Sequence, residues 1–164
     1  MEFYDDGHRA LEIARELATA QRSRYIRPVH ILLGTLRALA GILQDVARAR
    51  GLDDRRLGEF MPAEGDAPEN KDPVLSEASR RVIEAAHQCS MGLGFSRISA
   101  AHLMLGLLRA PDREIAPIFE RFGVDRAGLE REFRERMPAN TDGTIGGRRK
   151  GYSVDGIRTG AAAS

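Results

Sequence analysis

The sequence contains an internal repeat, and this feature constrains the fold more than any other. Shifting the chain by 72 residues aligns residues 9–61 with 81–133 without a gap, so that His30 falls on His102. Thirteen aligned positions are identical. A single fixed offset makes chance a poor explanation, and we interpret the chain as a tandem duplication whose two copies share one local fold.

Apolar residues in each copy recur at helical spacing. In the first copy Ala10, Ile13, Ala14 and Leu17 stand three or four residues apart, which places them on one face of a helix. Ala, Leu, Arg and Glu favour helices, whereas the absence of Trp and an aromatic content of 5% count against a sandwich or barrel. We predict an all-α fold, an eight-helix pseudo-twofold domain made of two tandem four-helix repeats.

Residues typical of helix ends set the limits of the predicted helices. Helices are expected from Pro28 to about Ala38 and from Ser99 to Ala110, and a third one in each copy should end at Gly51 or Gly123. Glycine suits the left-handed residue after a helix, and Ser or Asp suits the residue before one. Further N-caps are predicted at Ser76, Asp53 and Asp125, and the helix after Asp53 should carry Leu57 and Met61.

Composition divides the chain into a domain and a tail. We predict a domain over residues 1–137, with repeat one at about 3–61 and repeat two at about 75–137. Residues 62–74 are rich in Pro and acidic side chains and predict an exposed linker. Residues 138–164 are rich in Gly, Ala and small polar side chains and predict a disordered tail.

No motif for catalysis or metal binding stands out. His30 and His102 occupy equivalent helical positions without further donors three or four residues on, so we assign them a structural role. The single thiol, Cys89, is expected to be buried and inert. There is no P-loop and no nucleophile motif. We therefore predict a protein that is not an enzyme, with no cofactor and no metal.

Charge and hydropathy limit the classes of partner that we expect. The net charge is +1, so nucleic acid is not an expected partner. No apolar run is long enough for a membrane span and the N-terminus is acidic. We expect a cytoplasmic protein with no membrane association.

A binding groove is the most credible functional site. Two apolar residues, Phe3 and Leu75, precede the first helix of each copy. If they meet at the seam between the copies, they form with charged neighbours a groove for an extended or helical peptide. The alternative is that both residues only staple their helices to the core. The predicted groove residues are Phe3, Arg9, Leu75, Arg80 and Glu84, with Arg81 beside them.

Two segments carry a resemblance to a known family. The stretches over residues 29–36 and 101–108, each after an Arg-x-x-Glu helix and before Gly-x-Asp, resemble the Clp repeat. This repeat forms the N-terminal domain of the ClpC and ClpA type of unfoldase. The resemblance covers about residues 3–137. It implies an eight-helix domain that docks adaptors and substrates for an AAA+ unfoldase feeding the ClpP protease.

The sequence departs from the family pattern at two sites. In the ClpC branch a glutamate before each motif histidine helps to hold phosphoarginine, and here those positions are Val29 and Ala101. Neutral side chains cannot pair with a guanidinium. The family's hydrophobic groove, which also receives cyclic peptide antibiotics, keeps counterparts at Phe3, Leu75, Arg80 and Glu84.

Family ATPase motifs are absent from the sequence, so we expect a free-standing Clp N-domain. The leading hypothesis is a non-enzymatic peptide-binding module of the Clp chaperone-protease system, with unfoldase subunits, adaptors or substrate peptides as partners. One alternative is a decoy that sequesters Clp-targeting peptides or cyclic antibiotics. Another is a regulator acting through its basic tail, where residues 146–151 include three cations.

Overall fold

The structure, a computed structural model, describes residues 1–68, 70–110 and 113–137, together with the backbone of two short strands near the C-terminus. Those strands, β3 (Tyr152–Ser153) and β4 (Asp155–Gly156), pair antiparallel. The remainder of the predicted tail, including its basic residues 146–151, lies outside the described residues.

Eight α-helices make up the described domain, as predicted. The first four are followed by a 3-10 turn, η1 (Gly58–Phe60), and the last four form the second copy. Their bounds are α1 (Asp5–Ala20), α2 (Pro28–Ala38), α3 (Gly41–Ala49), α4 (Asp54–Leu57), α5 (Glu77–Gly92), α6 (Ala100–Arg109), α7 (Ile115–Arg121) and α8 (Arg126–Arg136).

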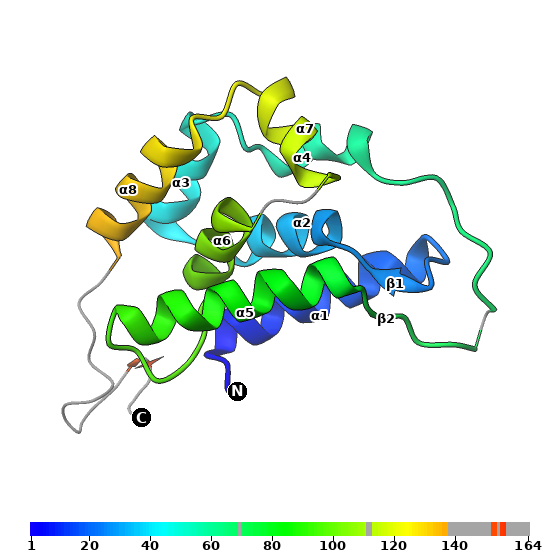
Figure 1. Cartoon of the computed structure of the whole chain (residues 1–164), viewed down its shortest axis with the longest axis horizontal. Coiled ribbons are helices and arrows are strands. Elements are labelled where there is room, and N and C mark those ends of the chain that lie inside the picture. The colour runs from blue at the N-terminus through cyan, green and yellow to red at the C-terminus, as the bar shows by residue number, and fades with distance from the viewer. Residues whose placement is uncertain (69, 111–112, 138–151, 154, 157–164) are drawn as a thin grey trace.

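The two copies are arranged around a pair of central helices. Helix α1 packs on α2, α5 packs on α6, and α2 contacts α6. Figure 1 shows α1 and α5 together along one side of the domain, with α3 beside α8 at one end. Helices α2 and α6 are buried over almost their whole length, so the core lies between the copies and belongs to both.

Glycine allows the helices of each copy to cross closely. A Cβ atom at Gly106 would lie 2.5 Å from the carbonyl oxygen of Val82 in α5, and one at Gly34 would collide with the carbonyl oxygen of Ala10 in α1. Both obstacles are backbone atoms, which cannot move aside without shifting a helix. The repeated glycine is therefore explained by packing.

The repeated histidines cap the two buried helices. Nδ1 of His30 accepts the backbone N–H of Arg27 at 2.9 Å, and Nδ1 of His102 accepts that of Ser99 at 3.0 Å. Both rings are fully buried. Burial, and to a lesser extent the charges of Arg27 and Arg134, respectively, lowers the pKa of His30 and of His102 to about 4. The predicted structural role is confirmed.

Short β-pairings join the copies, and the sequence analysis did not predict them. Strand β1 (Tyr25–Ile26) pairs in parallel with β2 (Val74–Leu75), so that Ile26 faces Leu75. An isolated parallel bridge joins Phe3 to Ile98. Since the offset of 72 maps Phe3 onto Leu75 and Ile26 onto Ile98, the two pairings are equivalent, and each copy begins by pairing with the other. Segments of two residues are too short for an alternating pattern to show in the sequence.

Two local expectations need correction. The helix after Asp53 ends at Leu57 and gives way to η1, so Met61 is not in it. Gly58 favours a helix end, and Pro62 disfavours a helical conformation at the residue before it. The segment 62–74 is mostly exposed but not wholly so, because Ala67 and Pro73 are buried and the Gly65 N–H donates to the Gln21 carbonyl at 2.7 Å.

Candidate functional site

Two surface hollows meet at Leu75, at the seam between the copies. The larger has a volume of about 660 Å³ and is lined by β1, β2 and the first two turns of α5. The smaller, of about 310 Å³, lies along one face of α1. Leu75 lines both hollows and also packs against the core. The site therefore rests on a residue whose position is fixed by β-pairing.

The larger hollow combines apolar side chains with charged ones. Val74 and Tyr25 are 55% and 49% exposed and lie opposite each other on the paired strands. The charges come from four side chains of α5. Among the described residues, none of the four makes an ion pair or a hydrogen bond. They are Glu77, Arg80, Arg81 and Glu84.

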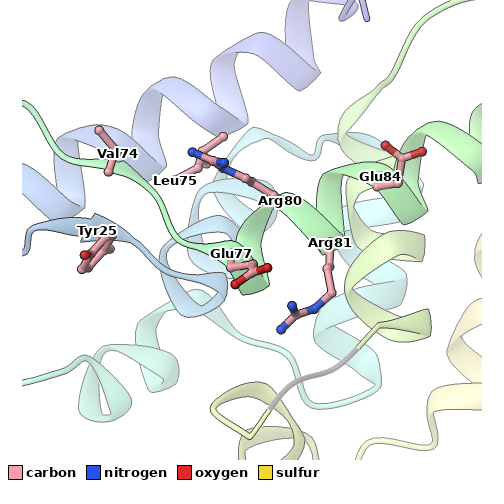
Figure 2. Close-up of a pocket in the computed structure, with 7 residues that line it drawn as sticks. All are labelled: Tyr25, Val74, Leu75, Glu77, Arg80, Arg81 and Glu84. Atoms are coloured by element: carbon pink, nitrogen blue, oxygen red, sulfur yellow. The ribbon is translucent and has the colours of Figure 1, made fainter.

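The charged side chains leave α5 in different directions. Figure 2 shows Arg80 extending toward Leu75, whereas Arg81 points away from Leu75. Glu84 lies about one helical turn beyond Arg80. Arg80 therefore places a guanidinium without an ionic partner in the described structure beside the apolar centre of the site.

The smaller hollow brings Phe3 and Leu75 together, as the sequence analysis expected. Its lining comes mainly from one face of α1 and consists of Phe3, His8, Leu11, Glu12, Arg15, Ile26 and Leu75. Phe3, like Leu75, is half-buried and packs against the core. Phe3 and Leu75 each pack against the core and also line the hollow, so an anchoring role and a place in the groove are compatible, and peptide binding there stays a prediction.

Four of the five predicted site residues line the two hollows. Phe3 lines the smaller one, Arg80 and Glu84 line the larger one, and Leu75 lines both. Arg9 lines neither. It is exposed on α1, about 100° around the helix from His8, and the structure does not place it with the others.

Several lining residues are not among the predicted ones, although the repeat indicates two of them. Position 8 maps onto 80 and position 12 onto 84, so the prediction of Arg80 and Glu84 also pointed to His8 and Glu12. Tyr25 and Val74 carried no such signal, because their exposure results from the unpredicted pairing of β1 with β2.

The starts of α2 and α6 are occupied by carboxylates of the chain itself. Val29 and Ala101 are buried, so neither offers a surface group to a ligand. The Val29 N–H donates to Oε1 of Glu114 at 3.2 Å, and the Ala100 N–H donates to Oδ1 of Asp6 at 3.1 Å. In both cases the carboxylate comes from the other copy. An anion approaching the start of α2 would meet the negative charge of Glu114.

Other site types find little support in the described residues. No group of three or more His, Cys, Asp or Glu side chains there is arranged to hold a metal ion. Cys89 is 3% exposed, and burial raises the pKa of its thiol, in accord with the predicted inert role. Within the same residues, no helix is both long and apolar enough to cross a membrane.

Solved structures of several N-terminal domains have the same fold as this chain. The N-terminal domain of Hsp104 from Candida albicans matches with a TM-score of 0.70 and 18% identity, covering 87% of this chain and 98% of that one. A ClpV N-domain in complex with a VipB peptide matches with a TM-score of 0.60 and 18% identity, covering 80% and 84%.

Comparison with protein sequences gives the family. A probable ATP-dependent Clp protease ATP-binding subunit of Chlamydia pneumoniae is 25% identical over 82% of this chain and 16% of its own length. ClpC/MecB of Bacillus subtilis, a negative regulator of genetic competence, is 25% identical over 87% and 18%. The chain thus spans less than a fifth of these relatives. The model of the Clp repeat (R) N-terminal domain matches residues 2–121 and 74–144, and the chain belongs to this family.

Proposed function

We propose that this protein is a non-enzymatic peptide-binding module of the Clp chaperone-protease system. It docks unfoldase subunits, adaptors or substrate peptides through the two hollows at the seam. The observation that carries the proposal is the meeting of both hollows at Leu75, where apolar side chains stand beside charges that make no ion pair in the described structure.

The chemistry of the hollows fits a short peptide. Leu75, Phe3, Leu11 and Ile26 offer apolar surface to a side chain, and burying such a side chain contributes about 1.5 to 3 kcal/mol. Unpaired charges at the rim give orientation and selectivity against wrong partners. A ClpV N-domain of the same fold holds a VipB peptide, which supports a peptide as the ligand here.

Selection from a displayed library of random heptapeptides tests the proposal. The full-length chain is the bait, and the affinity of the enriched peptide is measured by fluorescence anisotropy. We expect Leu75→Ala to weaken binding at least tenfold because it removes apolar surface from both hollows. Ile42→Ala is the matched control, since Ile42 is 51% exposed on α3 and lines neither hollow.

Equal affinity for wild type and Leu75→Ala would place the binding elsewhere and refute the groove. Failure to enrich any peptide would remove the proposed function altogether. Circular dichroism of each variant verifies that the fold is intact.

A further inference from the structure

One edge of the small β1–β2 sheet is open. The Val74 N–H donates to the Arg24 carbonyl at 3.1 Å and the Ser76 N–H to the Ile26 carbonyl at 3.1 Å. Leu75 lies between Val74 and Ser76, and its backbone N–H and C=O therefore point away from β1. Among the described residues, neither the N–H nor the C=O of Leu75 has a hydrogen-bond partner.

The opposite edge of the same sheet is closed. Tyr25 points its backbone groups away from β2, and the side chain of Ser23 takes both of them. Oγ of Ser23 donates to the Tyr25 carbonyl at 2.7 Å and accepts the Tyr25 N–H at 3.3 Å. The contrast leaves Leu75 as the position of this sheet where a further strand can pair.

The open edge coincides with the site. Leu75 carries the free backbone groups, and its side chain lines both hollows. A strand added beside it would place alternate side chains on opposite faces. The groove face of α1 from His8 to Arg15 rises about 10 Å, a length that three or four extended residues cover.

We propose that the ligand binds as an extended strand on the free edge of β2. Its backbone pairs with the N–H and C=O of Leu75, and one apolar side chain enters the hollow formed with Phe3. Because Arg80 extends toward Leu75 without a carboxylate partner in the described structure, the ligand carries an acidic residue next to the apolar one. This inference rests on the proposed function and specifies its ligand as an extended acidic-apolar segment.

A designed peptide tests the inference, with the full-length chain as receptor. The probe is acetyl-Thr-Val-Leu-Asp-Val-Thr-amide, in which β-branched residues favour the extended form. Its variants carry one N-methyl group at each position in turn. N-methylation should weaken binding at least tenfold where the peptide N–H pairs with Leu75, and less than twofold at both neighbouring positions, since strand pairing alternates.

Hydrogen exchange supplies a second readout. In the free protein the amides of Val74 and Ser76 should be protected and that of Leu75 should not, and saturating peptide should slow exchange at Leu75 at least tenfold. Arg80→Gln should weaken the Asp-containing probe at least fivefold and leave an Asn-containing probe unchanged. Arg131→Gln is the matched control, since Arg131 is exposed on α8 and lines neither hollow, and it should change neither affinity more than twofold.

The outcomes separate this inference from the proposed function. If a library-selected peptide depends on Leu75 but the probe does not bind, or binds equally with every N-methyl group, strand addition is wrong and the groove stands. If the peptide side chains that contribute to binding stand three or four residues apart, the ligand binds as a helix. If neither peptide binds, both proposals fall.

Discussion

The two copies agree in the buried layer and differ at the groove. Beneath the surface the same residues recur, as Gly34 with Gly106 and His30 with His102, and they make the same backbone contacts. On the groove face Glu12 and Glu84 match, whereas Phe3 is replaced by Leu75, His8 by Arg80 and Arg15 by His87. Packing thus keeps the copies alike where helices cross, and the groove is where they have diverged.

Even in the buried layer the match is incomplete. Nε2 of His30 lies 2.9 Å from Oε1 of Gln21, whereas Nε2 of His102 has no hydrogen-bond partner among the described residues. The offset replaces Gln21 by Leu93. Likewise Oγ of Ser79 donates to the Ile26 carbonyl at 2.7 Å, while its counterpart is Gly7, where a Cβ would strike the Ile98 carbonyl. Equivalent positions in the two copies therefore keep the same backbone contact, whereas the hydrogen bonds of their side chains differ.

The largest effect is expected from substitutions that disrupt the close helix crossings. Gly34→Ala and Gly106→Ala should each lower the free energy of unfolding by about 2 to 3 kcal/mol, because the new methyl group meets backbone. Urea denaturation measures both. Gly92→Ala is the control, since nothing lies within 4 Å of a Cβ there, and it should be neutral or slightly stabilising. A large loss in only one of the two variants would contradict the equivalence of the crossings.

The next effect is pH dependence arising from the two histidines. Their folded pKa values of about 4 lie below the ordinary 6.5, so the unfolded chain binds more protons between these values. Stability should be full above pH 6.5 and fall toward pH 4, by at most roughly 3 kcal/mol per histidine. His30→Gln with His102→Gln should flatten this slope, because glutamine can still accept at the helix start without titrating. An unchanged slope would assign the pH dependence to other groups.

A smaller effect concerns the starts of α2 and α6. With Val29 and Ala101 buried and Glu114 at the start of α2, we predict no measurable binding of free phosphoarginine by calorimetry. Glu114→Gln removes a negative charge at the start of α2. It should change the binding of phosphoarginine little, since the substitution adds no acidic group to pair with the guanidinium. Saturable binding to the wild type at the start of either helix would show that the neutral positions do not prevent recognition.

Much of the fold could be predicted because it depends on local signals. The capping side chains of Ser76, Asp53 and Asp125 accept backbone N–H groups as expected, and Gly51 and Gly123 have positive φ. The β-pairings could not be predicted, since they depend on how the copies meet. For the same reason Tyr25 and Val74 were missed, and Arg9 was assigned to the site from its sequence position although it lies on another face of α1.

The central claim is that the seam at Leu75 receives a peptide. The most direct test is an amide NMR titration of the full-length chain with the library-selected heptapeptide. We predict that shift changes concentrate on Phe3 and on the segments 8–15, 25–26 and 74–84, which contain the residues that line the two hollows, and leave α3 and α8 unaffected. Shift changes confined to α3 and α8, with residues 74–84 unmoved at saturation, would contradict the account.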